Sequence, residues 1–293
     1  LGLTAAVFAL PKNAFNKDIP NSLGQKIEVA ESQNNVENRP VAISSFKPVP
    51  TVTARSAIII DAKTGTSLWA KDPNLKHLPA STTKMMTALT ALEKCSPTDV
   101  VVVKSLEKAG TQMGLELGDT LTVESLLYGL LINSGNDAAY TLANSCSDSY
   151  AIFIESMNSK AEELKMINTH FTNPAGFDDP TQYSTAADLA KLAKVITANP
   201  LIAKIVTTKS TVVTDVSGNK TYFLENVNKL LGIVEGIEGV KTGQTEGSLE
   251  ILITKTTRNN NSIITAVLGS QDRFGESKEL INWSFENFTW QNN

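Results

Sequence analysis

Segments with the pattern of β-strands occur near both ends of the chain, and a long helical section separates them. Near the start, SAIIIDAKTGTSLWAKD has two short apolar stretches around a turn at residues 61–65, which is typical of a hairpin. After residue 210, strand-like runs return, among them SLEILITKTTR and SIITAVLGS around three asparagines. Because strands and helices do not alternate, we predict an α+β fold in which helices flank an antiparallel sheet.

The middle section has helical periodicity. Five segments repeat apolar residues with helical spacing: STTKMMTALTALEKC, VESLLYGLLI, NDAAYTLANSC, YAIFIESMNSKAEELK and STAADLAKLAKVITAN. The first is apolar around nearly its whole circumference, which predicts a deeply buried helix. In the last, Ser184 or Thr185 is a suitable N-cap. We therefore expect a mostly helical subdomain beside the sheet, and a closing helix in SKELINWSFENF.

The first 50 residues differ in composition from the rest. LGLTAAVFAL is apolar but shorter than the ~20 residues that a membrane-spanning helix needs. Residues 11–50 are rich in Asn, Ser, Pro and Lys and lack apolar periodicity. We interpret residues 1–50 as the remnant of an export signal or anchor plus a flexible linker, and residues 51–293 as the folded domain. A buried strand or an ordinary N-terminal segment is the alternative for the apolar stretch.

Composition argues against several classes of function. The net charge is −4, and the 26 basic residues form no Lys/Arg-rich run, so we predict no nucleic-acid partner. The two cysteines form no Cys-x-x-Cys pair, and His77 and His170 lack metal-ligand spacing. We therefore predict neither a metal nor another cofactor.

A Ser-x-x-Lys pair opens the buried helix. Four such pairs occur in the chain, but only Ser81 and Lys84 begin an apolar helix, where the spacing places hydroxyl and amine on one face. A desolvated lysine can be neutral and accept the proton of a serine. Ser81 is therefore a candidate nucleophile, and Lys84 is its candidate base.

Two further motifs follow Ser81 in order. Ser134-Gly135-Asn136 lies between two apolar helices, unlike the other Ser-x-Asn sequences. Lys241-Thr242-Gly243 lies among strand-like residues, where a sheet edge can face a substrate, whereas the Lys-Thr-Gly at residues 63–65 is expected to be a hairpin turn. Ser-x-x-Lys, Ser-x-Asn and Lys-Thr-Gly form the set known from class A β-lactamases and penicillin-binding proteins.

Four blocks of the chain resemble the low-molecular-mass penicillin-binding proteins that are serine-type D-alanyl-D-alanine carboxypeptidases. They are HLPASTTKMMTALTALE, LLINSGNDAAYTLA, THFTNPAGFDDPTQYSTAADLAKLA and GIEGVKTGQT. The resemblance implies a β-lactamase/penicillin-binding transpeptidase-like fold. It also implies removal of the terminal D-Ala from peptidoglycan stem pentapeptides through an acyl-enzyme, acylation by β-lactams, and a location outside the cytoplasm, with membrane anchoring possible outside the chain.

The resemblance also implies catalytic roles for five residues. Lys84 would take the proton of Ser81, and Lys241 would keep Lys84 neutral through like-charge repulsion. Ser134 would relay a proton to the leaving amine. Asn136 would hold the amide of the substrate.

Other residues would bind the substrate. Backbone N–H groups of Ser81 and Gln244 would receive the oxyanion. Thr242 and Gly243 of the Lys-Thr-Gly motif would contact the substrate, with the Thr242 hydroxyl at its terminal carboxylate, and Arg273 lies where the family carries an arginine near that group. Gln244 replaces the more familiar aromatic residue or histidine, but the oxyanion role needs only its backbone.

The two cysteines are expected at the far ends of the two helices that begin at the site. An oxidising compartment would allow a disulfide between Cys95 and Cys146, provided that their Cα atoms approach within about 7 Å. The sequence leaves open whether this bond forms.

Three alternatives stay open. A class A β-lactamase would add a glutamate that activates the deacylating water, but its Glu-x-x-Leu-Asn signature is absent from the sequence. A catalytically silent wall-binding protein would keep the fold without releasing D-alanine. A serine-lysine amidase or esterase acting on small molecules is the third, and Thr242 and Arg273 weigh against it.

Overall fold

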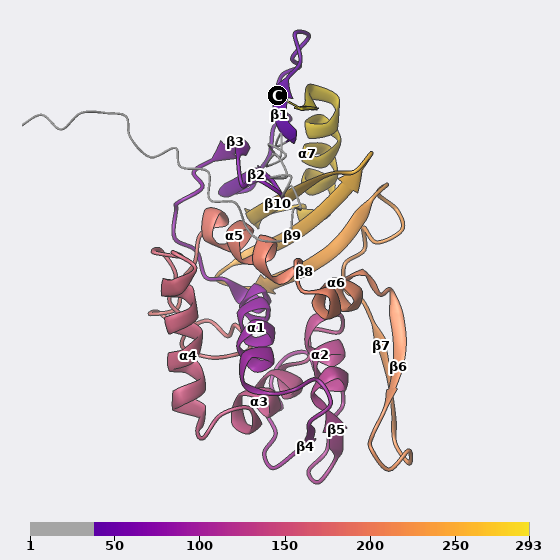
Figure 1. Ribbon diagram of the computed structural model, residues 1–293. Helices are drawn as coiled ribbons and strands as arrows, with labels where there is room; N and C mark the ends of the chain where they lie inside the picture. The colour runs from indigo at the N-terminus through magenta and orange to yellow at the C-terminus, as the bar shows by residue number, and fades with distance from the viewer. Residues whose placement is uncertain (1–37, 293) are drawn as a thin grey trace, which may run out of the picture. The chain divides into compact units, whose positions relative to one another are not determined.

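A five-stranded antiparallel sheet forms the centre of the fold, and helices cover both of its faces (Figure 1). The computed structural model describes residues 38–292. In spatial order the strands are β3 (Ser67–Lys71), β2 (Ser56–Asp61), β10 (Asn261–Ser270), β9 (Leu249–Arg258) and β8 (Ile237–Thr245). Strands from both ends of the sequence meet in this sheet, which confirms the predicted α+β architecture.

Both faces of the sheet are buried because each carries its own apolar cluster. Successive side chains of a strand point to opposite faces, and all six residues of β2 are buried. Ile59 packs in the cluster that contains α7 (Arg273–Asn287), whereas Ile58 and Ile60 belong to the larger cluster that contains α5 (Ala186–Ile196). The unbroken apolar run of β2 therefore reflects a sheet that is covered on both sides.

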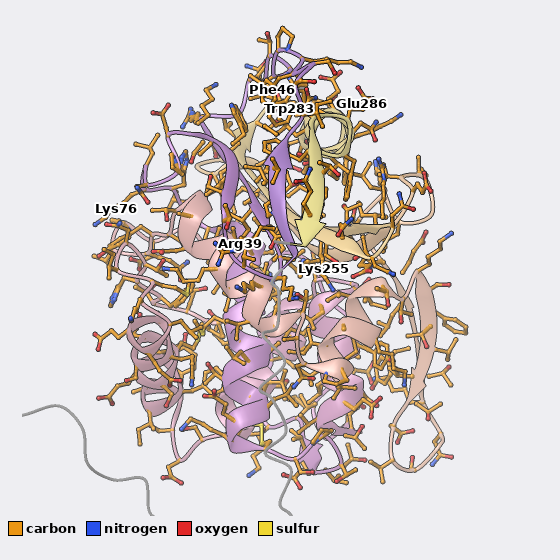
Figure 2. The ribbon with its side chains drawn as sticks, turned by 45° about the horizontal axis from the view of Figure 1, so that its top comes forward. Arg39, Phe46, Lys76, Lys255, Trp283 and Glu286 are labelled. Atoms are coloured by element: carbon orange, nitrogen blue, oxygen red, sulfur yellow. A yellow bond between two sulfur atoms is a disulfide. The ribbon has the colours of Figure 1, made fainter. Side chains whose placement is uncertain are left out.

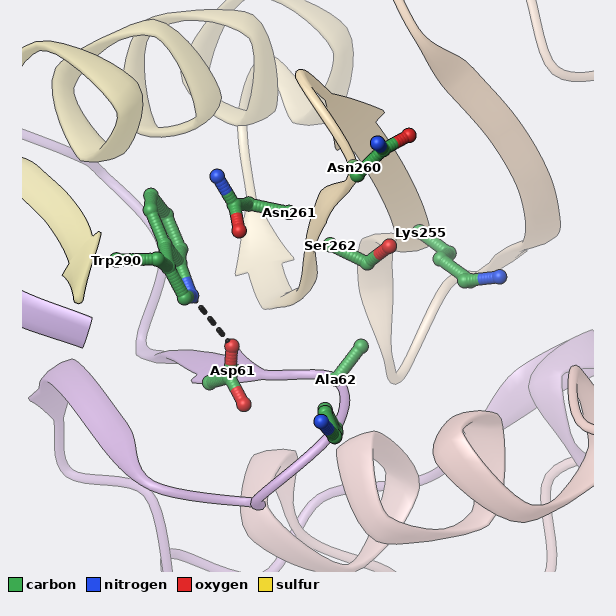
Figure 3. Close-up of a pocket in the computed structure, with 8 residues that line it drawn as sticks. Asp61, Ala62, Lys255, Asn260, Asn261, Ser262 and Trp290 are labelled. Carbon is green, nitrogen blue, oxygen red and sulfur yellow. Dashed lines mark hydrogen bonds between the residues drawn. The ribbon is translucent and has the colours of Figure 1, made fainter. Parts of the chain in front are cut away.

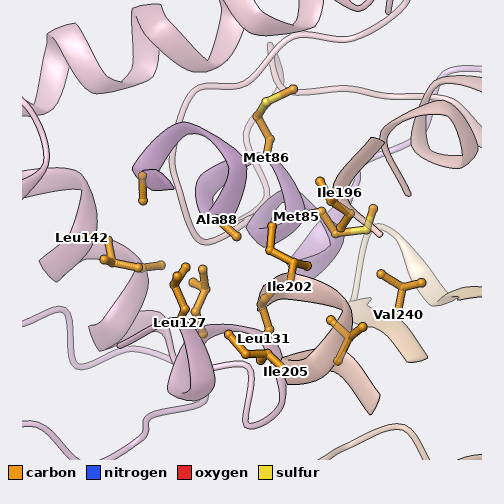
Figure 4. Packing of buried hydrophobic residues seen from close by; sticks show 14 of the residues in the cluster. Met85, Met86, Ala88, Leu127, Leu131, Leu142, Ile196, Ile202, Ile205 and Val240 are labelled. Carbon is orange, nitrogen blue, oxygen red and sulfur yellow. The ribbon is translucent and has the colours of Figure 1, made fainter. Parts of the chain in front are cut away.

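The helical subdomain packs beside the sheet, as predicted. Its helices are α1 (Lys84–Lys94), α2 (Val123–Leu131), α3 (Asn136–Ser145), α4 (Tyr150–Glu163) and α6 (Pro200–Thr207). Figure 4 shows Met85 of α1, Leu131 of α2 and Ile202 of α6 in one apolar cluster, and all three side chains are almost fully buried. The near-continuous apolar surface of α1 thus marks a central helix of this subdomain.

Local capping decides where α5 begins. The Thr185 side chain, and not that of Ser184, accepts a hydrogen bond from the Asp188 N–H, as an N-cap does. Ser184 instead pairs through its backbone with His77 in an isolated β-bridge. This bridge ties the start of α5 to the segment that leads into the Ser-x-x-Lys motif.

The last part of the expected linker is in contact with the fold. Asn38–Ala42 forms β1, which pairs with β11 (Phe288–Asn292). Phe46 packs edge-on against Trp283 of α7, with ring centroids 5.4 Å apart (Figure 2). The strands β1 and β11 are about 250 positions apart in the sequence, so local composition could not predict that they pair. The division at residue 50 stays a prediction, and the proposed export signal lies outside the described residues.

Two short strand pairs lie outside the central sheet, in addition to the β1–β11 pair. A hairpin-like pair is formed by β4 (Val100–Val102) and β5 (Thr120–Thr122), and another by β6 (Ser210–Thr214) and β7 (Thr221–Glu225). The second pair lies in the region after residue 210 where the sequence predicts strands. Within residues 38–292, none of the helices combines the length and hydropathy that crossing a bilayer requires.

A disulfide joins the two helices that begin at the Ser-x-x-Lys and Ser-x-Asn motifs. Cys95 follows α1 and Cys146 follows α3, and their Cα atoms are 5.5 Å apart. The sequence separation of 51 residues corresponds to roughly 4 kcal/mol of stabilisation if the bond acts by restricting the unfolded chain. The bond that the sequence left open is therefore present.

Candidate active site

Ser81 lies in a tight turn rather than in the α-helix that the sequence predicted for it. The turn Ala80–Thr83 is a 3₁₀ helix, and α1 begins only at Lys84. Ala80 has a φ of 47°, a left-handed conformation that L-residues seldom adopt. The chain therefore bends sharply just before Ser81, which lines the pocket described below.

Lys84 is fully buried and has three oxygen partners. Its Nζ atom lies 3.0 Å from Ser81 Oγ, 2.7 Å from Asn136 Oδ1 and 2.7 Å from the carbonyl oxygen of Ala175. Burial and the nearby charge of Lys241 hold the pKa of Lys84 well below its usual value. Both effects favour the neutral amine beside the serine hydroxyl. Burial is the larger of the two causes, and both were expected from the sequence.

A second buried lysine faces the serine of the Ser-x-Asn motif. Lys241 Nζ donates to Ser134 Oγ at 2.9 Å and to the Thr242 carbonyl oxygen at 3.0 Å. Burial, assisted by the charge of Arg273, lowers the pKa of Lys241 to about 7. Ser134 has a φ of 62° in the short connection between α2 and α3, which turns its hydroxyl toward β8.

Asn136 is fixed by partners on both sides of its amide. Its Oδ1 accepts from Lys84, and its Nδ2 donates to the Ala109 carbonyl oxygen at 2.8 Å. Since the Ala109 carbonyl can only accept, Nδ2 must face it, and Oδ1 is left to accept from Lys84. Asn136 therefore links Lys84 to the loop at residues 109–115.

Two glycines allow the backbone to approach the Ser81 turn closely. A Cβ atom on Gly176, which has a φ of +89°, would lie 1.8 Å from the Ala80 carbonyl oxygen. A Cβ atom on Gly243 of β8 would lie 3.1 Å from Ala80 Cβ and 3.3 Å from the Ser81 nitrogen. The loop that carries Ala175 and the strand that carries Lys241 are therefore packed directly against the nucleophile turn.

These elements surround a pocket of about 280 Å³. Its lining residues are Ser81, Thr111, Ser134, Val227, Thr242, Gly243, Gln244 and Arg273. None of these lining residues carries a carboxylate. Arg273 donates to the Gly243 carbonyl oxygen at 2.8 Å, and its Nε atom is buried without a partner among the described residues. A cationic group with unused hydrogen-bonding capacity thus borders the pocket.

The structure brings all the predicted site residues together. Lys84, Asn136 and Lys241 are not among the lining residues, but each is hydrogen-bonded to one of them, Ser81, Thr111 and Ser134 respectively. Arg273 opens α7, which Asp272 caps by accepting from the Gly275 N–H, so this helix starts earlier than predicted. Sequence reasoning missed some contributors to the site: Thr111, Val227 and the Ala175 carbonyl. They stand in loops without periodicity and reach the pocket only through tertiary folding.

Lys63 of the other Lys-Thr-Gly motif lines a separate pocket, and Figure 3 shows that pocket with Asp61 and Trp290. There the Asp61 carboxylate accepts from the Thr64 N–H and hydroxyl with one oxygen, and from the Trp290 indole N–H at 2.7 Å with the other. The motif at residues 63–65 is therefore a hairpin turn, as expected. In the part of the chain that the structure describes, no cluster of three His, Cys, Asp or Glu residues could hold a metal ion.

The sequence of the chain matches a known protein family. A model of the D-alanyl-D-alanine carboxypeptidase family matches residues 43–272. The chain is 33% identical over 245 residues to DacF of Bacillus subtilis and 34% identical over 254 residues to DacA of Haemophilus influenzae, both D-alanyl-D-alanine carboxypeptidases. The alignments cover 80% and 82% of this chain and 63% of each relative, so the chain spans less than two thirds of their length.

Solved structures show the same fold. A DD-transpeptidase from Streptomyces superposes with a TM-score of 0.76 at 31% identity, covering 82% of this chain and 100% of that chain. A D-alanyl-D-alanine carboxypeptidase from Mycobacterium tuberculosis superposes with a TM-score of 0.77 at 31% identity, covering 84% of this chain and 96% of that chain. The chain belongs to the D-alanyl-D-alanine carboxypeptidase family.

Proposed function

We propose that this protein releases the terminal D-alanine from peptides that end in D-Ala-D-Ala, through an acyl-enzyme on Ser81. The observation that carries the proposal is the 3.0 Å contact between Ser81 Oγ and the buried amine of Lys84. A serine hydroxyl becomes an effective nucleophile when a base accepts its proton. Lys84 is the group placed to do so.

The partners of Lys84 define the direction of proton transfer. A neutral amine has two N–H groups and one lone pair. The Asn136 and Ala175 oxygens can only accept, so they take the two N–H groups. The lone pair is then left for the Ser81 hydroxyl, which donates its proton as Oγ attacks the carbonyl carbon of the D-Ala-D-Ala bond.

Lys241 and Ser134 supply the proton that the leaving amine needs. With a pKa of about 7, Lys241 is present in both protonation states near neutral pH. Its contact with Ser134 Oγ, which lines the pocket, provides a route for a proton to the amine of the departing D-alanine. Breaking the peptide bond forms the acyl-enzyme, and water later hydrolyses the ester and regenerates Ser81.

The remaining lining residues fit a substrate that ends in a carboxylate. The unpartnered Nε of Arg273 and the Thr242 hydroxyl offer donors to that carboxylate, and Gly243 lets the substrate approach β8 closely. Backbone N–H groups of Ser81 and Gln244 receive the oxyanion of the tetrahedral intermediate. Asn136 holds the peptide amide.

The substrate proposed for this site is the peptidoglycan stem pentapeptide. That assignment places the protein outside the cytoplasm, with residues 1–50 acting as export signal or anchor and linker. β-Lactams would acylate Ser81 in the same way. Because no lining residue carries a carboxylate that could activate water, the penicillin adduct is expected to hydrolyse slowly, unlike that of a class A β-lactamase.

Release of D-alanine from a short peptide ending in D-Ala-D-Ala tests the function. We expect the parent protein to release D-alanine and Ser81→Ala to lose activity by at least about a thousandfold, since the nucleophile is removed. Ser105→Ala is the matched control, because Ser105 has the same spacing to a lysine but is exposed and outside the pocket. A folded parent that releases no D-alanine, or a Ser81→Ala variant as active as the parent, would contradict the proposal.

A further inference from the structure

A buried carboxylate stands next to the site and has no role in the mechanism above. Asp137 is the second residue of α3, and only 1% of its surface is exposed. One of its oxygens accepts from the Met113 and Ala138 N–H groups at 2.9 Å each. The other accepts from the Gly114 and Leu115 N–H groups at 2.9 and 3.0 Å. Three of these four donors belong to one loop, residues 109–115.

The same loop forms a wall of the pocket and is bonded to Asn136. Thr111 lines the pocket, and its carbonyl oxygen accepts from the Asn136 N–H at 2.7 Å. The Ala109 carbonyl oxygen accepts from Asn136 Nδ2. A Cβ atom on Gly110 would lie 2.5 Å from Asn136 Nδ2, so loop and amide are in close contact. Asn136 thus holds the first half of the loop, and Asp137 holds the second half.

Asp137 also acts electrostatically on the base. Among the described residues, the charged groups that act on Lys84 are Lys241 from β8 and Asp137 from α3, while the loop at 173–178 contributes the Ala175 carbonyl. Burial and Lys241 lower the pKa of Lys84, whereas Asp137 raises it, because a negative charge favours the protonated amine.

We propose that Asp137 is a positioning residue for acyl transfer, whose carboxylate holds the loop at 109–115 against Asn136 and so aligns Asn136 with Lys84. The inference rests on the function proposed above. An ionised carboxylate suits this place because it can accept four hydrogen bonds with two oxygens. An asparagine there can offer only one oxygen, and its NH₂ group would face backbone N–H groups that also donate.

The test is Asp137→Asn, measured as the second-order rate of Ser81 acylation by penicillin between pH 5 and 10. We expect the rate to fall by about ten- to hundredfold, since displacement of a positioning contact by about 1 Å has effects of that size. The acid limb of the pH profile is the rise of the rate with pH as Lys84 loses its proton. We expect this limb to move to lower pH, because removal of the negative charge of Asp137 lowers the pKa of Lys84. Simple loosening of the fold would lower the rate without moving this limb.

Asp188→Asn is the matched control. Asp188 is also buried at the start of a helix and accepts from the Asn168 N–H and the Thr169 hydroxyl, but it is outside the pocket. This control should keep both the acylation rate and the acid limb of the parent. The proposal is overturned if Asp137→Asn acylates within threefold of the parent with an unmoved acid limb, or if Asp188→Asn moves the limb equally.

A second variant tests the positioning role without removing the carboxylate. Gly110→Ala presses the loop on the Asn136 amide and should lower acylation while leaving the acid limb in place. Its control is Gly218→Ala, since both glycines have positive φ, +70° and +76°, but nothing lies within 4 Å of a Cβ at 218. Parent-like acylation by Gly110→Ala would contradict the inference alone. Absence of any adduct on the parent would contradict the proposed function as well.

Discussion

Replacement of Lys84 by arginine is expected to slow acylation of Ser81 by about a hundred- to ten-thousandfold, the range that loss of a general base covers. A guanidinium group keeps the positive charge and the capacity to donate, but it stays protonated at every accessible pH. It therefore cannot accept the serine proton, and the planar group does not fit the three oxygens that surround the lysine amine. Stopped-flow acylation with a chromogenic cephalosporin measures the rate.

The control for this substitution lies on the same helix. Lys94 is the exposed last residue of α1, so Lys94→Arg makes the same lysine-to-arginine substitution away from the site. We expect its acylation rate to equal that of the parent. If Lys84→Arg folds, as judged by circular dichroism, and acylates within tenfold of the parent, Lys84 is not the base.

Replacement of Gly176 by alanine is expected to destabilise the protein by roughly 3 kcal/mol and to reduce acylation by about a hundredfold or more. The new Cβ atom would meet the carbonyl oxygen and carbon of Ala80, which are backbone atoms of the turn that carries Ser81. Relief of this collision requires the turn or the Ala175 carbonyl to move, and either movement disturbs the contact of Ser81 with Lys84. Urea unfolding and the acylation rate measure the two effects.

Gly118→Ala separates collision from backbone strain. Gly118 has a φ of +90°, close to the +89° of Gly176, but nothing lies within 4 Å of its Cβ position. Its alanine variant should cost only the roughly 1–2 kcal/mol of left-handed strain and should acylate at the rate of the parent. If the two variants have the same stability and the same acylation rate, the close packing around Ser81 does not contribute to acylation.

The order of the motifs was sufficient to predict which serines, lysines and asparagine lie close together in the structure. The motifs of Ser81 and Ser134 stand at the starts of helices, which the local pattern reveals, whereas Lys241 lies within β8. In the structure, hydrogen bonds connect Lys84 to Ser81 and Asn136, and Lys241 to Ser134. Local patterns also predicted the buried helix and the strands of the antiparallel sheet. These features depend on residues close in sequence, where helical and strand periods are directly visible.

The remaining features depend on contacts between distant residues. The Ala175 carbonyl is 91 positions from Lys84, and the Met113 N–H is 24 positions from Asp137. A backbone carbonyl or N–H leaves no trace in side-chain patterns, so neither contact was predicted. The 3₁₀ turn at Ser81 was missed for a related reason, because the packing of Gly176 and Gly243 against it sets the conformation.

Intact mass after incubation with penicillin tests the central claim, an acyl-enzyme on Ser81. We predict that the parent gains the mass of one penicillin molecule and retains it for minutes or longer. Ser81→Ala should gain none, although it keeps both lysines and the pocket. The claim is contradicted if Ser81→Ala carries the same adduct, or if the folded parent carries none at penicillin concentrations that saturate a known member of the family.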